Sequence, residues 1–257
     1  MEFGNYRFLI KLTDDAFLPY YKGSTFRGLL GHAMRSVVCP LKRNECSSCI
    51  LCSTCTYALV FETGLVLALP HTPRVSAPPH PMVLEPPLTE KREFKKGETL
   101  ECGLLLFGKI NKNLPCFIHA FGEMGRIGIG KKIGGKRAGF VLERVSSSNE
   151  VIFSKDNGVV SMPQPLDLIF SLDRQDNSFS DCLKIQMVTP LRILKGNAGK
   201  ADLSFPLLLR SMIRRTTSLL NAYGQGEPRG DYALLVKKAE EVNHAELRSP
   251  PFKNALR

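Results

Sequence analysis

One short segment combines the two residue types that hold phosphate groups in proteins. Residues 125–139 include six glycines and five Lys or Arg, and none of them is acidic. Glycine lets the backbone approach a ligand closely, and the cations pair with phosphate oxygens. We therefore predict a backbone cradle for a polyanion, with contacts from Arg126, Gly128, Gly130, Lys131, Lys132, Lys136 and Arg137.

Two other interpretations of this segment compete. A solvated basic loop that binds nothing has the same composition. A nucleotide P-loop fits in part, because Gly125 to Lys131 matches G-x-x-x-x-G-K. Lys132, however, stands where Ser or Thr would hold magnesium, and three more glycines follow where a helix should begin. Nucleic-acid phosphate is therefore the favoured ligand.

A cysteine cluster is the second group with evident chemistry. Five cysteines lie within seventeen residues: Cys39, Cys46, Cys49, Cys52 and Cys55. C-x-x-C turns direct two thiolates at one tetrahedral ion, so we expect a structural zinc site with one thiol spare. An iron–sulfur cluster on the C-x-x-C-x-x-C run and a set of free thiols are the alternatives. Three scattered cysteines are predicted to be small core residues: Cys102, Cys116 and Cys182.

The polar face of a predicted first helix supplies a candidate proton acceptor. His32 lies next to Gly31 and one helical turn after Gly28, and Arg27 and Arg35, which we expect to contribute phosphate contacts, share this face. Two glycines inside a helix cost about 1 kcal/mol each relative to alanine, which suggests that something approaches this face closely. Imidazole exchanges protons near neutral pH, so His32 is a candidate to abstract a 2′-hydroxyl proton. The alternative is a surface histidine, or one bonded to the neighbouring insertion.

Other polar residues are weaker candidates. His119 lies on a mostly apolar helix and is expected in the core, whereas His71 and His80, in a proline-rich loop, are possible ligand contacts. A second basic stripe, flanked by Arg215, lies on a helix predicted over 204–223 and consists of Arg210, Arg214, Thr217 and Asn221. Such a stripe is usually a solvated face, but here it adds to a basic surface.

The composition narrows the class of protein. The chain has 257 residues, 43% of them hydrophobic, and a formal net charge of +11. A core is therefore expected, and the positive charge favours an acidic polymer or a membrane surface as partner. No stretch reaches the roughly 18 apolar residues of a spanning helix, and no secretory signal begins the chain. These features predict a cytoplasmic protein.

Hydrophobic periodicity predicts the elements that position these groups. We expect a strand at 6–12, a helix capped by Ser24 or Thr25 and ending near 38, strands at 57–61 and 65–69, and an extended proline-rich loop at 70–87. A strand at 99–107, a helix at 114–124 and a strand at 140–145 complete a β-α-β-β-α-β order. This order predicts an α+β, ferredoxin-like domain over residues 1–147.

The second half is predicted to be an incomplete unit of the same kind. Residues 148–165 are turn-rich and are interpreted as a linker with at most a short hairpin. A second, partial ferredoxin-like domain is expected over 166–257, with a strand at 183–188 and helices at about 204–223 and 233–242. Its other strands and second helix are not evident.

Several of these segments together resemble one known family. The run LPYYKGSTFRG at 18–28, the HAMR segment at 32–35, the cysteines, and residues 57–63 resemble a CRISPR-associated RAMP protein. More narrowly, they are similar to the cysteine-containing branch of the precursor-CRISPR-RNA processing endoribonucleases. Further matching segments are 79–87, 105–108, the glycine-rich 128–139 and 189–192.

The resemblance implies tandem RRM-like domains and metal-free cleavage of CRISPR repeat RNA. In such cleavage the 2′-hydroxyl attacks the adjacent phosphate and leaves a 2′,3′-cyclic end. It implies His32 as general base or acid, Tyr21 and Lys22 as helpers, and no cofactor for catalysis. It also implies zinc on Cys39, Cys46, Cys49 and Cys55, with Cys52 spare.

Two other functions remain open. One is a non-catalytic RAMP subunit that binds CRISPR RNA beside other effector subunits, and the other is a redox or iron–sulfur protein. Relatives continue past the position of Leu247 into a segment that residues 248–257 do not match. The resemblance therefore implies a chain truncated near its end, whose RNA affinity and cleavage should be compared with those of a chain carrying a restored C-terminus.

Overall fold

The fold is built on an antiparallel sheet, seen in a computed structural model that describes residues 1–41, 45–67, 78–148, 150–158, 160–163, 166–167, 185–191 and 203–242. The sheet order is β3 (Met82–Glu85), β5 (Thr99–Phe107), β1 (Glu2–Leu12), β8 (Phe140–Ser147) and β9 (Glu150–Ser154). All neighbours are antiparallel, and the short β10 (Leu166–Asp167) pairs with the first residues of β1.

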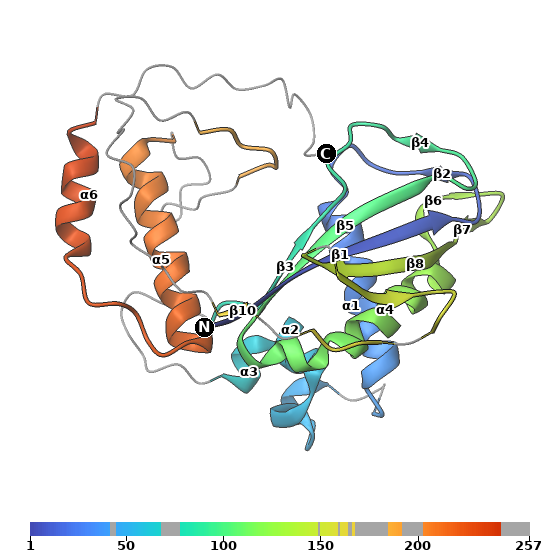
Figure 1. Cartoon of the computed structure of the whole chain (residues 1–257), viewed down its shortest axis with the longest axis horizontal. Coiled ribbons are helices and arrows are strands. Elements are labelled where there is room, and N and C mark those ends of the chain that lie inside the picture. Colours follow the sequence, from blue (N-terminus) through green and yellow to red (C-terminus); the bar gives the residue numbers. More distant parts are fainter. Residues whose placement is uncertain are drawn as a thin grey trace.

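Two helices cover one face of this sheet. They are α1 (Gly23–Val38) and α4 (Leu114–Ile127), which lie next to each other behind β1 and β8 (Figure 1). The chain order β1-α1-β3-β5-α4-β8, with the first strand in the centre beside the third and fourth, is the ferredoxin-like arrangement. The predicted α+β class and the β-α-β-β-α-β order are therefore confirmed.

Alternation along β1 decides which face is buried. Tyr6, Phe8, Ile10 and Leu12 are buried against the helices, while Arg7 and its outward neighbours are more exposed. Phe8 stacks on Phe121 of α4 with ring centroids 4.1 Å apart. A strand with one face in the core and one toward solvent gives this period of two.

A buried hydrogen-bond network fixes the start of β1. The hydroxyl of Tyr6 donates to Oδ1 of Asn111 at 2.9 Å, and Nδ2 of Asn111 donates to the carbonyl of Gly108 at 2.8 Å. Burial raises the pKa of Tyr6 to about 12. Asn111 belongs to the 3-10 helix η3 (Gly108–Asn113), so the network ties the end of β5 to the central strand.

The region between α1 and β3 differs from the prediction. Residues 57–61 lie in a helix, α2 (Thr56–Phe61), and residues 65 and 66 end a second helix, α3 (Thr63–Val66), after which residue 67 is irregular. The two predicted strands are therefore wrong over the described residues; 68 and 69 lie outside them. The second strand of the unit is instead β3, inside the proline-rich segment, where it pairs with β5. A short apolar run fits either a buried helix or a strand, and pairing with a distant segment determines which of the two forms.

Helix starts also differ in detail. Helix α1 begins at Gly23 with Lys22 in the N-cap position, so Ser24 and Thr25 lie inside the helix and neither caps it. Helix α5 (Phe205–Tyr223) begins after Ser204, as predicted, without a side-chain cap. Helix α6 (Tyr232–Glu240) is capped by Asp231, whose Oδ1 accepts from the backbone N–H of Leu234 at 2.9 Å.

The described part of the second half consists of few elements. Helices α5 and α6 pack side by side (Figure 1). Residues 185–188 are not a strand, contrary to the prediction, and 183–184 lie outside the described residues. Inside the predicted linker, residues 150–154 form β9, which hairpins with β8. No helix in the described segments combines the length and apolar character needed to span a membrane.

Two small ribbons and two 3-10 turns complete the described elements. β2 (Ala16–Phe17) pairs with β4 (Glu93–Phe94), and β6 (Ile129–Ile133) pairs with β7 (Lys136–Ala138). The turns η1 (Cys46–Ser48) and η2 (Cys52–Thr54) lie in the cysteine-rich insertion. The β6–β7 ribbon packs against β2, at the end of the sheet where α1 begins.

Two glycines of α4 offer a matched test of this packing. A Cβ at position 125 would lie 2.0 Å from the carbonyl oxygen of Phe140 on β8, whereas a Cβ at position 122 would meet nothing within 4 Å. We expect Gly125→Ala to lower the free energy of unfolding by about 1–3 kcal/mol, because the helix must move away from β8. We expect Gly122→Ala to raise it by about 0.5–1 kcal/mol through helix propensity. Urea denaturation of both variants measures the difference, and equal effects would contradict the packing described.

Candidate functional site

The glycine-rich segment forms the β6–β7 hairpin. Gly134 and Gly135 make its turn with φ of 59° and 85°, which suits a two-residue hairpin turn. Gly128 and Gly130 are buried: a Cβ on Gly128 would lie 2.8 Å from Cβ of Arg137, and one on Gly130 would lie 2.5 Å from the carbonyl oxygen of Phe17. These glycines allow close approach of the chain to itself, so the predicted glycine cradle is a hairpin that carries charge on its surface.

The cations of this hairpin differ in how they are engaged. Nη1 of Arg137 donates to the carbonyl of Gly130 at 2.6 Å, and Nζ of Lys136 lies 3.5 Å from Asp14. Arg126, just before the hairpin, pairs with Glu123 at 3.1 Å. Lys131 and Lys132 are exposed and form no ion pair within the described residues. The hairpin therefore presents two freely available ammonium groups to solvent.

One stripe of α1 is covered by α2. Arg27, Gly31 and Arg35 follow each other at four-residue spacing, and they face the stacked rings of Tyr57 and Phe61. The guanidinium of Arg27 lies 5.5 Å from the centroid of Phe61, and that of Arg35 lies 5.7 Å from Tyr57. A Cβ on Gly31 would approach Phe61 to 3.3 Å. The close approach predicted at Gly31 is therefore made by the protein's own helix.

The adjoining stripe of α1 is open. Ser24, Gly28, His32 and Ser36 are all exposed, and a Cβ on Gly28 would meet nothing within 4 Å. His32 thus stands on a ridge of small side chains, with room for a ligand beside its ring. His119 of α4 is also exposed, so its predicted core position is wrong, because its helical phase directs it away from the sheet.

The two predicted helpers do not share the surface of His32. Lys22 is 1% exposed, and its amine donates to the carbonyls of Tyr20 at 3.1 Å and Thr89 at 2.6 Å. Burial, and then the charge of Arg92, lower the pKa of Lys22. Tyr21 precedes α1, and a rise of about 1.5 Å per residue separates it from His32 by roughly 15 Å along the axis.

The cysteines form a repeated turn. The backbone N–H of Cys49 donates to Cys46 at 3.3 Å, that of Cys52 to Cys49 at 3.0 Å, and that of Cys55 to Cys52 at 3.3 Å. Burial raises the pKa of the Cys46 thiol, Arg35 lowers it, and Glu62, Cys52 and Cys55 raise it further. Cys52, predicted as the spare thiol, is therefore one of the two thiols that act on Cys46.

The fit of this cluster to a metal is partial. Its soft thiol donors and C-x-x-C turns suit zinc or an iron–sulfur cluster. Within the described segments, however, no three His, Cys, Asp or Glu side chains come together closely enough to hold an ion. Residues 42–44, which join Cys39 to the turns, lie outside the description. Of the scattered cysteines, Cys102 is buried as predicted, Cys116 is half-buried against the core, and Cys182 lies outside the described residues.

A second histidine site was only weakly indicated by the sequence. Nδ1 of His80 lies 2.8 Å from Oγ1 of Thr63, which is 1% exposed and donates to the carbonyl of Leu59 at 2.9 Å. Desolvation lowers the pKa of His80, as do the charges of Arg27 and Arg215; a hydrogen bond to the backbone of Val60 and the charge of Glu62 raise it. The signal for this site was the histidine set among prolines at 78–81, which gives no hint of its neighbours.

The basic stripe of α5 lies on its exposed side. Arg210 and Arg214 are exposed, as the helical pattern predicts, and the structure does not bring them into an ion pair within the described residues. His71 and residues 192–202 lie outside the description. The predicted RNA-binding residues are therefore spread over α1, the end of α4, the β6–β7 hairpin and α5.

These features define an α+β protein whose ferredoxin-like domain carries a basic hairpin and a cysteine-rich insertion. The chain belongs to the AF_1859_N family, whose model, described as an N-terminal domain, matches residues 1–165. It is similar to an uncharacterized protein of Archaeoglobus fulgidus, with 24% identity over 212 residues that cover 82% of this chain and 66% of the relative. The chain thus spans slightly less than two thirds of that relative.

Proposed function

We propose that this protein is an RNA-processing endoribonuclease of CRISPR immunity, a cytoplasmic RAMP protein that binds CRISPR repeat RNA and cleaves it without a metal ion. The observation that carries the proposal is the placement of His32, exposed on a small-residue ridge of α1. The same domain presents Lys131 and Lys132, exposed and without an ion pair in the described part of the chain, on its hairpin. A ferredoxin-like sheet with exposed cations also suits single-stranded RNA.

The chemistry requires only proton transfer at one phosphodiester. The imidazole of His32 takes the proton of a ribose 2′-hydroxyl, whose oxygen then attacks the adjacent phosphorus. The bond from phosphorus to the 5′-oxygen breaks, and the leaving oxygen takes a proton from solvent or from the histidine. The products are a 2′,3′-cyclic phosphate and a 5′-hydroxyl. Lys22, which the resemblance implies as a helper together with Tyr21, is buried at the start of α1, so the proposed proton transfer relies on His32.

The alternative is a non-catalytic RAMP subunit that binds CRISPR RNA within an effector complex. One observation favours it: within the described residues, no hydrogen bond orients the ring of His32. A general base is usually held in position by a second group. Incubation of labelled repeat RNA with the protein in EDTA separates the two proposals, because only the endoribonuclease generates cyclic-phosphate ends.

A structural zinc ion is part of this proposal. The resemblance assigns it to Cys39, Cys46, Cys49 and Cys55, and Cys52, which lies in the same run of turns, is the competing ligand. Zinc there would fix the insertion that carries α2 and so hold α2 on the Arg27–Arg35 stripe of α1. Four thiolates would fill all four coordination positions of the zinc ion and leave none open for a catalytic water or substrate.

We expect one zinc ion per chain in protein purified without chelators. Cys46→Ser should abolish binding, and Cys52→Ser decides whether Cys52 is a ligand or the spare thiol. Cys116→Ser is the matched control, because this thiol is half-buried outside the cluster. Elemental analysis provides the measurement. Metal-free protein, or iron in anaerobically purified protein, would contradict the assignment.

We expect the hairpin lysines to set the salt dependence of RNA binding. Each neutralised phosphate of a single strand adds about 0.7 to the slope of log affinity against log salt, so Lys131→Ala with Lys132→Ala should flatten the slope by roughly 1.4. Lys237→Ala with Lys238→Ala, another exposed pair, is the control. Fluorescence anisotropy with labelled repeat RNA over a potassium chloride series measures both. An unchanged slope would show that the hairpin is not in contact with phosphate.

We expect His32→Ala to lower the single-turnover cleavage rate by about 10²–10⁴-fold, the usual cost of one acid–base group, while RNA affinity changes only a few-fold. His119→Ala, which removes another exposed helical histidine, should cleave at the parental rate. The measurement uses labelled repeat RNA in EDTA. A parental rate for the His32 variant, or loss of binding together with cleavage, would refute its role in proton transfer.

A further inference from the structure

The ring of Tyr20 differs from the other aromatic rings of this protein in its exposure. Of the aromatic residues that the structure describes, Tyr20 alone is exposed, with 57% of its surface accessible to solvent. It lies in the short connection between β2 and α1, outside the hydrophobic core. A single exposed ring is common on protein surfaces, so its surroundings decide what it can do.

A guanidinium group holds this ring in place. The guanidinium of Arg92 lies 4.8 Å from the centroid of the Tyr20 ring and 4.5 Å from that of Phe17. The two rings form no aromatic pair with each other in the described part of the chain, so Arg92 bridges them. Nε of Arg92 donates to the carbonyl of Leu18 at 3.4 Å, and the N–H of Leu18 donates to the carbonyl of Arg92 at 2.8 Å. The cation and the two rings therefore form one preformed stack.

The backbone that carries this stack is tethered to one buried lysine. The amine of Lys22 donates to the carbonyls of Tyr20 and Thr89, which belong to two separate segments. Thr89 lies three residues before Arg92, so this single ammonium joins the segment of the ring to the segment of the guanidinium. Groups that are already fixed lose little conformational freedom when a ligand binds.

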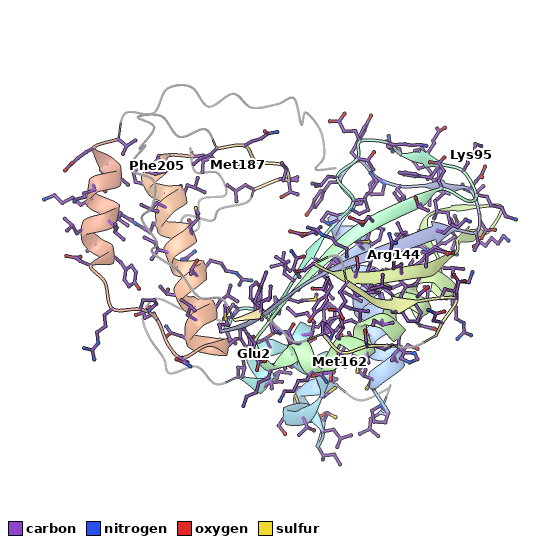
Figure 2. The ribbon with its side chains drawn as sticks, viewed as in Figure 1. Glu2, Lys95, Arg144, Met162, Met187 and Phe205 are labelled. Carbon is purple, nitrogen blue, oxygen red and sulfur yellow. The ribbon has the colours of Figure 1, made fainter. Side chains whose placement is uncertain are left out.

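The stack adjoins the basic hairpin. Phe17 belongs to β2, which packs against β6 and β7, and a Cβ on Gly130 would lie 2.5 Å from the carbonyl oxygen of Phe17. Lys131, the next residue, is one of the two exposed cations of the hairpin. Figure 2 shows Lys95, which directly follows β4, at this end of the sheet and far from Phe205 of α5.

The charge of Arg92 is available to a ligand. Arg92 forms no ion pair within the described residues, although Glu90 and Glu93 flank it in the sequence. Apart from Nε, no nitrogen of this guanidinium donates to an acceptor in the structure as described. A guanidinium stacked on aromatic rings keeps the donors at its edge, where a pair of them matches two oxygens of a phosphate.

We propose that Tyr20 and Arg92 form a platform for one nucleotide of the RNA, with its base stacked on the ring of Tyr20 and its phosphate bound by Arg92. Proteins bind single strands by combining aromatic rings that stack on bases with cations that follow the backbone. Every base has a π face, so the platform accepts any base, while the hairpin lysines hold neighbouring phosphates. The inference rests on the proposed function for the identity of the ligand as RNA.

The sequence contains no tryptophan, which gives a direct test of base stacking. Tyr20→Trp keeps an aromatic ring and makes it the only tryptophan of the chain, so its fluorescence reports contact with a base. We expect single-stranded repeat RNA to quench this emission and inorganic polyphosphate, which carries charge without bases, to leave it unchanged. Tyr232→Trp is the matched control, because this half-buried ring lies on α6, far from the hairpin (Figure 1), and its emission should not respond.

Affinity measurements separate stacking from charge. Tyr20→Ala should weaken binding of repeat RNA by about 5- to 150-fold, the usual cost of one lost base stack, without changing the salt slope. Tyr20→Phe keeps the ring and should bind as the parent does. Arg92→Ala should lower the slope by about 0.7, and Arg92→Lys, which keeps the charge, should restore it. Fluorescence anisotropy measures binding, and thermal unfolding followed by circular dichroism checks that each variant is folded.

The outcomes separate the platform from the proposed function. Emission that RNA does not change, equal quenching by polyphosphate, or parental affinity of the Tyr20→Ala variant overturns the platform. Cyclic-phosphate ends formed in EDTA without quenching support the endoribonuclease and overturn the platform. Quenching by RNA without cyclic-phosphate ends supports the platform and refutes the endoribonuclease. A parent protein that binds no RNA overturns both.

Discussion

The central strand β1 is the constraint on which the rest of the structure depends. It pairs with β5 on one side and β8 on the other, and its inward side chains belong to the same buried core as those of the helices that cover that face. A slip of one residue in either pairing would turn Phe8 toward solvent and Arg7 into the core. The register thereby fixes where α1 and α4 lie, and with them the open ridge that carries His32 and the exit into the basic hairpin.

Most of the ferredoxin-like unit could be predicted from the sequence because its main elements have strong periodicity. The strand at 99–107 has the predicted bounds, and α1, α4, β8 and α5 begin and end close to them. The strand prediction for residues 57–61 was wrong because a short apolar run fits either a helix or a strand. The strand at Met82–Glu85 was missed because prolines flank it and because it pairs with β5, which lies some twenty residues later in the chain. Local pattern carries no information about such partners.

The candidate site was likewise predictable only where local pattern was sufficient. Helical phase was sufficient to predict that His32 is exposed, whereas His119 was misplaced because an apolar helix still has one solvent face. The partner of Gly31 was not predictable, since Phe61 reaches it only when residues 56–61 are helical. The segment that carries His80 is held partly by a contact across a much longer separation, since the bond from Tyr223 to Pro79 spans 144 residues. Side chains from distant segments meet only once the fold is known.

The burial of Lys22 has a consequence for how a polyanion finds this protein. Its ammonium lies at the N-terminal end of α1, donates to two backbone carbonyls, and is paired with no carboxylate within the described residues. The positive end of the helix dipole lies at the same place. Together they form a fixed source of positive potential beneath the surface, which counter-ions screen less than exposed lysines. Long-range steering of an incoming strand, and hence its association rate, therefore depends in part on a charge that the strand never touches.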